Sequence, residues 1–183
     1  MVRDPERTKA KLLEAATAEF VEHGFGATRI DHIAERAGIN KRMIYAYFGG
    51  KEQLFERVIH DSLVQLVDTV PITPGDLPGY AGRLFDYLVA HPERRRLALW
   101  RQLEGPTVTA EEIASTEAKH AAIEATIPPD ERMPPAALLT IIAAVVSAWP
   151  PSSGPVLETQ RATVVEAVRR LQRPLLPYAG HAD

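Results

Sequence analysis

The stretch RAGINKRMIYAYFGGKEQLF, from Arg36 to Phe55, gathers hydrogen-bonding side chains on what its pattern predicts to be one short helix. Lys41 and Arg42 open this helix, and Tyr45 and Tyr47 follow. Cations and phenol hydroxyls can bind phosphate oxygens, and an arginine can also bind the edge of a guanine base through O6 and N7. The chemistry indicated is the recognition of a nucleic acid.

The expected helix, residues 41–48, turns these side chains away from its buried face. At about 100° per residue, Ile44 and Phe48 lie roughly 40° apart and define the buried side. The opposite direction falls between Arg42 and Met43, with the tyrosines on the two flanks. A helix in a DNA major groove needs this distribution, because its outermost side chains near the N-terminus read bases while its flanks meet phosphates. For an arbitrary helix, packed tyrosines and solvated cations would explain the same pattern.

The elements before this helix favour the DNA reading. A supporting helix is expected over residues 5–23, with one apolar stripe. Thr28 stands three residues before Asp31, a capping-box spacing that predicts the start of a second helix. Gly38 turns the chain, and Asn40 is placed to cap the third helix. Two short helices joined at a glycine after a longer helix are typical of a helix-turn-helix.

The stretch GFGATRIDHIAERAGINKRMIYAYFGGKEQLFERVI resembles the N-terminal signature of the TetR family of transcriptional regulators, and the likeness covers about residues 8–60. Between the loop signals the apolar periodicity is helical, so the sequence predicts an all-α protein with about nine helices. The resemblance implies a helix-turn-helix DNA-binding domain over residues 1–50, an effector-binding and dimerisation domain over residues 51–183, and a homodimer. We therefore expect a DNA-binding regulator of a palindromic operator, a ligand-responsive repressor by family tendency, with a small-molecule effector.

The resemblance also transfers DNA contacts by position to this sequence. The candidate DNA-binding residues are Thr28, Arg29, Asn40, Lys41, Arg42, Met43, Tyr45, Tyr47 and Lys51, the last on the phosphate backbone. Arg42 stands where family members often have a small residue, and Met43 where they often have a hydroxyl. The operator sequence is therefore not predicted, but we expect Arg42 to read a guanine.

The rest of the chain predicts further helices separated by proline-rich and glycine-rich loops, and one such loop, from Pro71 to Gly79, is expected to precede a helix that follows Gly79. Aromatic and leucine side chains among them are candidates for the lining of an effector cavity, although plain core packing would explain them too: Tyr80, Phe85, Tyr87, Trp100, Leu103 and Trp149. The helices at about 134–149 and 155–173 carry apolar stripes, and two such hairpins across a two-fold axis would make a four-helix bundle. Burial of both helices within one subunit is the alternative.

Composition bounds these expectations. The formal net charge is −3, and residues 1–60 hold 10 Lys and Arg against 9 Asp and Glu, so charge alone does not predict nucleic-acid binding. The chain has no cysteine, which fits a reducing compartment, and we expect a cytoplasmic protein. Its longest apolar run, residues 136–149, is shorter than the roughly 20 residues of a membrane span, so we expect no membrane partner.

Two other classes of function compete with this one. An enzyme is disfavoured, because there is no phosphate loop, no dinucleotide fingerprint and no histidine pair at metal-ligand spacing, so we expect no cofactor and no metal. The run His60-Asp61-Ser62 brings reactive types together, but adjacent residues point to different faces of a helix. A helical module that binds only protein is the second rival, and it predicts no salt-dependent affinity for DNA.

Overall fold

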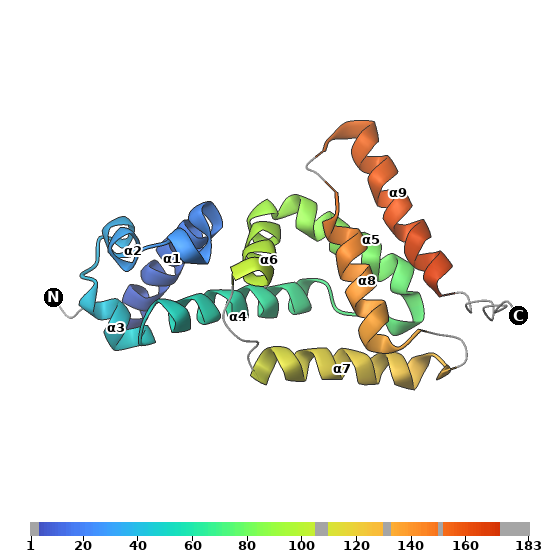
Figure 1. Ribbon diagram of the computed structural model, residues 1–183, viewed down its shortest axis with the longest axis horizontal. Coiled ribbons are helices and arrows are strands. Elements are labelled where there is room, and N and C mark those ends of the chain that lie inside the picture. The colour runs from blue at the N-terminus through green and yellow to red at the C-terminus, as the bar shows by residue number, and fades with distance from the viewer. Residues whose placement is uncertain (1–3, 105–109, 130–132, 150–151, 173–183) are drawn as a thin grey trace, which may run out of the picture. The chain divides into compact units, whose positions relative to one another are not determined.

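The described part of the chain is built from helices (Figure 1). The computed structural model describes residues 4–104, 110–129, 133–149 and 152–172. Within those ranges it contains nine α-helices, one short 3₁₀ helix at Pro74–Asp76 and no strand, which confirms the predicted all-α class. The α-helices are α1 (Pro5–Ala27), α2 (Ile30–Ala37), α3 (Arg42–Phe48), α4 (Lys51–Thr69), α5 (Leu77–Ala90), α6 (Pro92–Glu104), α7 (Ala110–Thr126), α8 (Pro135–Ser147) and α9 (Gly154–Leu171).

Internal packing divides the chain into two compact units. The first unit contains residues 1–68 and 91–112, and so it holds α1 to α4 together with α6. The second unit contains residues 69–90 and 113–183, with α5, α8, α9 and most of α7. The first unit extends past the predicted boundary at residue 50 because α4 buries Leu54 and Phe55 in its core. The predicted boundary separates a DNA-binding domain from an effector-binding domain, and this division of function stays a prediction.

Helix α1 is fixed at both ends by local chemistry. Asp4 caps its start, since its Oδ1 accepts a hydrogen bond from the Glu6 backbone N–H at 3.0 Å. The predicted end at His23 agrees with a break in helical geometry at Gly24, where φ is 77° and ψ is 177°. A Cβ at Gly24 would also lie 2.9 Å from two ring carbons of Trp100 on α6. Glycine is therefore required here both for the backbone conformation and for the close approach of the indole.

The core of the first unit holds α2 and α3 by their inner faces. Phe20 of α1 and Phe55 of α4 meet edge to face with ring centroids 4.9 Å apart, and Phe25 lies 5.1 Å from Phe55. Ile33 of α2 and Ile44 of α3 are completely buried in the same core. Because Ile44 anchors α3 from inside, the opposite face of that helix is left for other contacts.

In the second unit, α5 begins earlier than the sequence predicts. The prediction placed its start after Gly79, whereas the helix begins at Leu77. Proline is tolerated in the first turn of a helix, so Pro78 does not delay the start. Asp76 supplies the cap, since its Oδ1 accepts a hydrogen bond from the Gly79 N–H at 2.9 Å. The sequence reading missed this cap because it treated the whole proline-rich stretch as a loop.

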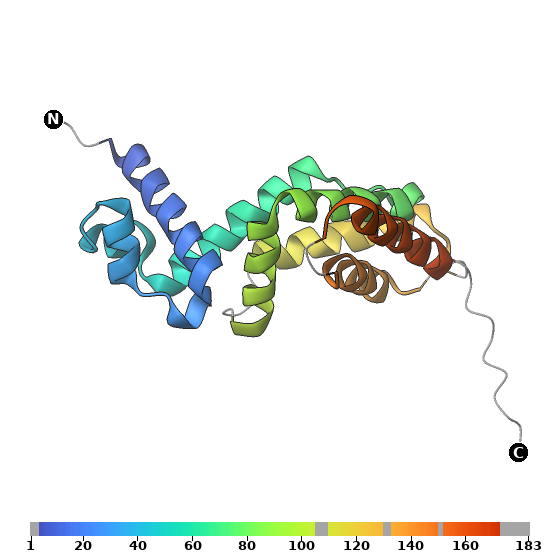
Figure 2. The ribbon, with the colours of Figure 1, turned by 90° about the horizontal axis from the view of Figure 1, so that it is seen from above.

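Helix α5 packs against α8 and α9, which also contact each other (Figures 1 and 2). A Cβ at Gly82 would lie 3.1 Å from a Val165 methyl carbon, so α5 and α9 approach closely. Asp86 and Arg161 join the same helices, with Nε 2.8 Å and 2.9 Å from the two carboxylate oxygens. Among the described residues, no helix has both the length and the apolar character that a membrane crossing requires.

Candidate nucleic-acid interface

The turn between α2 and α3 is built as the sequence predicts. Gly38 adopts the left-handed conformation, with φ 64° and ψ 33°, and its N–H reaches the Ala34 and Glu35 carbonyls. The Oδ1 of Asn40 then accepts a hydrogen bond from the Arg42 N–H at 2.9 Å. The predicted glycine turn is confirmed. Asn40 makes the hydrogen bond expected of a cap, but from one position before the N-cap of α3, which is Lys41. Together the turn and this hydrogen bond set the direction in which α3 leaves α2.

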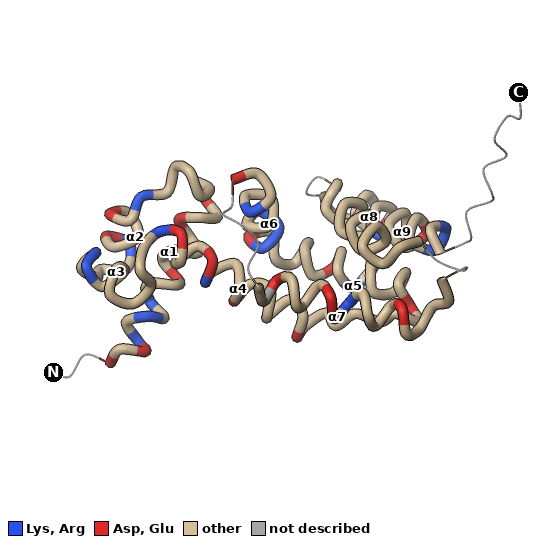
Figure 3. Tube along the Cα trace, turned by 60° about the horizontal axis from the view of Figure 1, so that its bottom comes forward, with Lys and Arg blue, Asp and Glu red and all other residues tan. Residues whose placement is uncertain are grey.

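Helix α3 divides its side chains between the core and the surface. Ile44 is fully buried, whereas Lys41 and Arg42 are exposed and Tyr45 is 55% exposed. Met43 is half-buried and packs against the core, so it is less outward than its helical angle predicts. The exposed side of α3 is consequently formed by cations, a phenol and the small residue Ala46. Figure 3 shows the basic charge at the N-terminal end of this helix.

The two tyrosines lie in different environments. Tyr45 projects into solvent, as a residue reaching for phosphate would. Tyr47 is half-buried, packs beside Phe48 with ring centroids 6.5 Å apart, and has the Lys9 ammonium 5.7 Å from its ring centroid. The two tyrosines therefore have different roles. Tyr45 is available to a ligand, whereas Tyr47 mainly packs one flank of α3 against the rest of the first unit.

An ion pair joins the starts of α2 and α3. Lys41 Nζ lies 2.8 Å from Asp31 Oδ1. The hydrogen bond and charge of Lys41 lower the pKa of Asp31, and Asp31 raises the pKa of Lys41 in the same way. Arg29, which precedes α2, and Asn40 are also exposed. These contacts place several of the predicted DNA-binding residues around the two helix starts, where a shallow hollow is lined by Asp31, Ala34, Glu35, Gly38, Ile39, Asn40, Lys41 and Arg42.

Thr28 does not occupy the role that the sequence predicts. Its side chain is 1% exposed, and its hydroxyl donates to the Gly24 carbonyl at 2.6 Å and lies 3.2 Å from the Glu19 carbonyl. The predicted capping box with Asp31 is wrong, because Arg29 is the N-cap of α2 and no side chain caps that end. The threonine hydroxyl instead donates to carbonyl groups at the end of α1, where the helical geometry breaks. This hydrogen bond depends on a buried acceptor nearby and not on the sequence spacing between Thr28 and Asp31.

Lys51 also faces the protein. Its ammonium group donates to the Thr28 carbonyl at 2.9 Å and to the Gly26 carbonyl at 3.4 Å, and it lies 4.5 Å from the Phe25 ring centroid. These contacts tie the start of α4 to the segment between α1 and α2. A phosphate contact by this lysine would require it to leave both carbonyls, so we leave Lys51 out of the proposed interface.

The predicted cavity residues are distributed over both units. Tyr80, Phe85 and Tyr87 are buried on α5 in the second unit, where burial raises the pKa of Tyr80. Trp100 and Leu103 belong to α6 in the first unit, where Trp100 covers Gly24 and Leu103 is 73% exposed. That these residues line one effector cavity stays a prediction.

Buried polar atoms without a partner mark the second unit. Trp149 lies two residues beyond the end of α8, and its Nε1 is buried without a hydrogen-bond partner among the described residues. The same holds for Nε2 of His120 on α7 and Oε1 of Gln160 on α9. Such atoms are costly unless a ligand or water meets them. His120 and Gln160 are candidates that the sequence analysis missed, since it considered only large apolar and aromatic side chains.

Comparison with known proteins agrees with this geometry. Residues 12–58 match bacterial regulatory proteins of the tetR family, and residues 76–170 match the tetracyclin repressor-like C-terminal domain. The HTH-type transcriptional repressor SCO4008 of Streptomyces coelicolor is 49% identical over 102 residues, 56% of this chain and 53% of that protein. The HTH-type transcriptional repressor NicS of Pseudomonas putida is 40% identical over 96 residues, 48% of this chain and 45% of that protein. The aligned stretch thus spans about half the length of these curated relatives.

A solved structure extends the likeness over most of the chain. The SCO4942 protein of Streptomyces coelicolor is 30% identical, with a TM-score of 0.75, and the match covers 91% of this chain and 99% of that one. Both halves of the chain match their family counterparts, and the structural match spans both units. The chain therefore belongs to the tetR family of bacterial regulatory proteins, which are transcriptional regulators rather than enzymes.

Proposed function

We propose that this chain is a DNA-binding transcriptional repressor that acts in the cytoplasm as a homodimer on a palindromic operator and responds to a small molecule. The observation that carries the proposal is the outward face of α3, where Lys41, Arg42 and Tyr45 project from a helix anchored by the buried Ile44. The relatives SCO4008 and NicS are named transcriptional repressors, which favours repression over activation.

In this proposal the exposed residues of α3 have distinct tasks. Arg42 lies at the N-terminal end of the helix, where side chains reach base edges, and its planar guanidinium suits the O6 and N7 of a guanine. Lys41 and Tyr45 flank it and bind phosphate, which fixes the register of α3 in the groove. Arg29 adds a cation at the start of α2. Asn40 acts mainly through its cap, which positions the Arg42 backbone.

The outward face of α8 supports the homodimer. This helix buries Leu138, Ile142 and Val146 within its own chain, whereas Ala143 and Ala144 are exposed. Its residues include no charged side chain, so an apolar partner can cover that face without burying a charge. We propose that α8 and α9 pair with their copies around a two-fold axis, within the predicted segments 134–149 and 155–173, although residue 173 lies outside the described residues. The α3 helices of the two subunits, about 34–36 Å apart, would then enter successive major grooves on one face of the DNA.

The unpartnered buried atoms of the second unit support an effector. A ligand with hydrogen-bonding groups would satisfy Trp149 Nε1, His120 Nε2 or Gln160 Oε1. The ligand lowers operator affinity if it binds more tightly to a conformation in which the spacing of the two α3 helices does not fit the operator. The loss of affinity is then set by the difference between its affinities for this conformation and for the DNA-binding one. Screening small molecules for release of operator DNA tests this part separately from DNA binding itself.

The decisive experiment compares Arg42→Ala with a matched control on the operator protected by the wild-type protein. Arg57→Ala removes the same charge from an exposed residue of α4 that pairs with Asp61 at 2.8 Å. We expect Arg42→Ala to lose about tenfold to a hundredfold of discrimination between the operator and a guanine-substituted operator, since one bidentate contact is worth ~1–3 kcal/mol. Arg57→Ala should keep that discrimination. Equal weakening on both duplexes by Arg42→Ala would make Arg42 a phosphate contact instead.

A further inference from the structure

A second group of ligand-type side chains lies on α1, outside the residues of the proposed interface. Glu22 and His23 stand three and four residues after Glu19, so each of them is a neighbour of Glu19 across one turn of the helix. One oxygen from each glutamate and one imidazole nitrogen all lie within 4.8 Å of one another. Carboxylate oxygen and imidazole nitrogen are both ligands of divalent transition metals.

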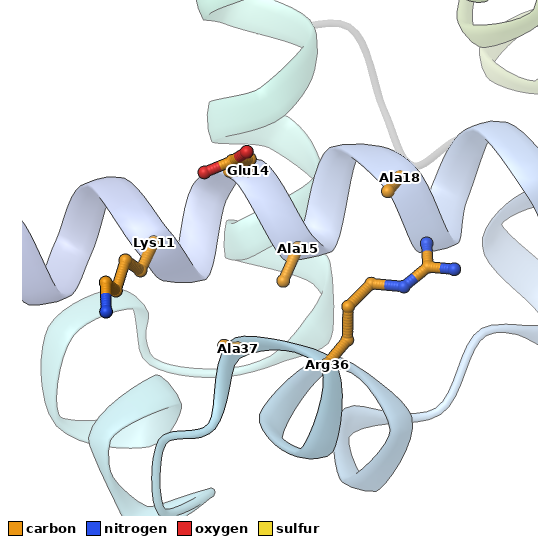
Figure 4. A pocket seen from close by; sticks show the side chains of 6 residues that line it. All are labelled: Lys11, Glu14, Ala15, Ala18, Arg36 and Ala37. Carbon is orange, nitrogen blue, oxygen red and sulfur yellow. The ribbon is translucent and has the colours of Figure 1, made fainter.

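Arg36 of α2 holds the two carboxylates in a divided arrangement. Its Nε lies 3.1 Å from Glu19 Oε1, and one of its terminal nitrogens lies 3.0 Å from Glu22 Oε2. The remaining oxygen of each carboxylate is 3.8 Å from His23 Nε2. Figure 4 shows the Arg36 guanidinium reaching from α2 to the side of α1. One oxygen of each carboxylate is therefore bound to the arginine, and the other is turned toward the imidazole.

The oxygen of Glu19 that faces the imidazole has no hydrogen-bond partner within the part of the chain that the structure describes. The residue is only 5% exposed, and its Oε2 is buried. An ionised carboxylate oxygen left without a partner in the interior is unfavourable, because it has lost water and gained nothing in return. This unpartnered oxygen, directed into a group of other ligand atoms, is the observation that distinguishes the cluster from an ordinary charged surface.

The geometry and charge of the cluster suit a cation. Bonds of about 2.0–2.2 Å at tetrahedral angles put ligand atoms roughly 3.4 Å apart. The imidazole nitrogen lies 3.8 Å from each facing carboxylate oxygen, and all three ligand atoms lie within 4.8 Å of one another, so they must move closer together to bind an ion. The Glu22 and His23 side chains are 55% and 43% exposed, so small rotations can close the gap. Two carboxylates, one guanidinium and a neutral imidazole leave one net negative charge. Arg36 does not have to leave, since it uses the opposite oxygens.

We propose that Glu19, Glu22 and His23 bind one divalent first-row transition-metal ion, such as Zn²⁺, with Arg36 as the positioning residue that orients both carboxylates. Three protein ligands leave at least one coordination position for water. Because Arg36 belongs to α2, the ion and its supporting arginine connect α1 to the helix that precedes the turn. The sequence predicts no metal site, because it has no pair of histidines at metal-ligand spacing, whereas this site depends on a buried glutamate.

Calorimetric titration of the chelator-treated full chain with ZnCl₂ tests the proposal without any DNA. We expect one saturable equivalent, weakened at least about tenfold in His23→Gln and Glu22→Gln, since even outer-sphere partners of a metal ligand contribute that much. Both replaced side chains are partly exposed, so these variants should fold. The control is His91→Gln, which removes another histidine beside a carboxylate, Glu93 at 3.3 Å, and should leave the affinity unchanged.

A thermal scan gives a second measurement. An ion that binds only the folded chain raises its melting temperature, so Zn²⁺ should stabilise the wild type and the His91→Gln variant but not His23→Gln. The proposal is overturned if no saturable binding occurs, if His23→Gln binds as tightly as the wild type, or if the control loses as much affinity. In those cases His23 serves only as an ion-pair partner of the two carboxylates. Operator binding is measured separately, so the two proposals fail independently.

Discussion

Helices α3 and α8 both bury one stripe and leave the other face uncovered, but the uncovered faces differ in chemistry. On α3 the buried residue is Ile44, and the exposed side chains include Lys41, Arg42 and Tyr45. On α8 the buried residues are Leu138, Ile142 and Val146, and the exposed ones include Ala136, Thr140, Ala143, Ala144 and Ala148 just after its end. Figure 3 shows basic charge at the start of α3 and no charged residue on α8.

The chemistry of the exposed face of each helix determines which kind of partner can bind it. A face with cations and a phenol keeps its hydration until a polyanion replaces it, which favours contacts that weaken with salt. A face of small apolar residues has no charge to desolvate, and it allows a second helix to approach closely. The inward stripes only attach the two helices to their cores, so changes on the two sides of each helix should have separable effects.

The largest effects are expected from the inward stripes. Ile44→Ala on α3 and Ile142→Ala on α8 each remove a side chain that is at most 1% exposed, which typically costs ~2–5 kcal/mol. Denaturant unfolding should show both losses. Ala46→Ser, on the exposed side of α3, should change stability by less than about 0.5 kcal/mol. A neutral Ile44→Ala variant would mean that α3 is not held by its inner face.

The next effect concerns the outward face of α8. Ala144→Glu would bury an unpaired charge if α8 pairs with its copy, so we expect the dimer to weaken by about a hundredfold while the helices remain folded. Sedimentation velocity across a dilution series measures this shift. Ala121→Glu introduces the same charge at an exposed position of α7 and should leave the oligomeric state unchanged. If both variants remain dimeric, the proposed pairing through α8 is wrong.

A smaller effect separates the two tyrosines of α3. Removing the exposed hydroxyl in Tyr45→Phe should weaken operator binding by about two- to tenfold, the range of one hydrogen bond of ~0.5–1.5 kcal/mol. Tyr47→Phe should have less effect on affinity, because Tyr47 is half-buried beside Phe48 and Lys9. Electrophoretic mobility shift with the operator gives both values. A larger loss of affinity in Tyr47→Phe than in Tyr45→Phe would mean that the Tyr47 side of α3 contacts the phosphate backbone.

The smallest effect is expected at the ion pair between α2 and α3. Asp31→Asn frees Lys41 from its carboxylate partner, so affinity for any duplex should rise a few-fold. The pKa of Asp31 is lowered by Lys41, so the pair persists at neutral pH and is lost only as the pH falls through the lowered value. The gain should therefore be constant across the neutral range in fluorescence anisotropy titrations. A loss of affinity would show that Asp31 helps to position Lys41 for DNA.

Local signals account for what the sequence predicted correctly. The Gly38 turn, the Asn40 cap and the buried Ile44 each depend on residues close in sequence, so spacing alone indicates them. The nine helices follow from apolar periodicity and from the prolines and glycines between them. The start of α5 was misplaced because an aspartate cap and a proline in the first turn look like a loop when no contacts are known.

Long-range contacts account for what it missed. Thr28 and Lys51 have side chains suited to DNA, but acceptors on α1 and on the segment after it hold both inward. Trp100 was grouped with the aromatic residues of α5, yet it covers Gly24, 76 positions earlier in the sequence. Tertiary packing decides the contacts of each of these side chains, and no residue close to them in sequence indicates those contacts.

The most direct test of the central claim is the affinity of the purified, effector-free chain for duplex DNA as a function of salt. Phosphate contacts release counterions, so the logarithm of the binding constant should fall linearly with the logarithm of the salt concentration, with a slope of about −0.9 for each contact. We predict binding to DNA at low ionic strength and a shallower slope in Lys41→Ala. A chain that binds no duplex at low ionic strength would contradict the assignment of α3 to the major groove.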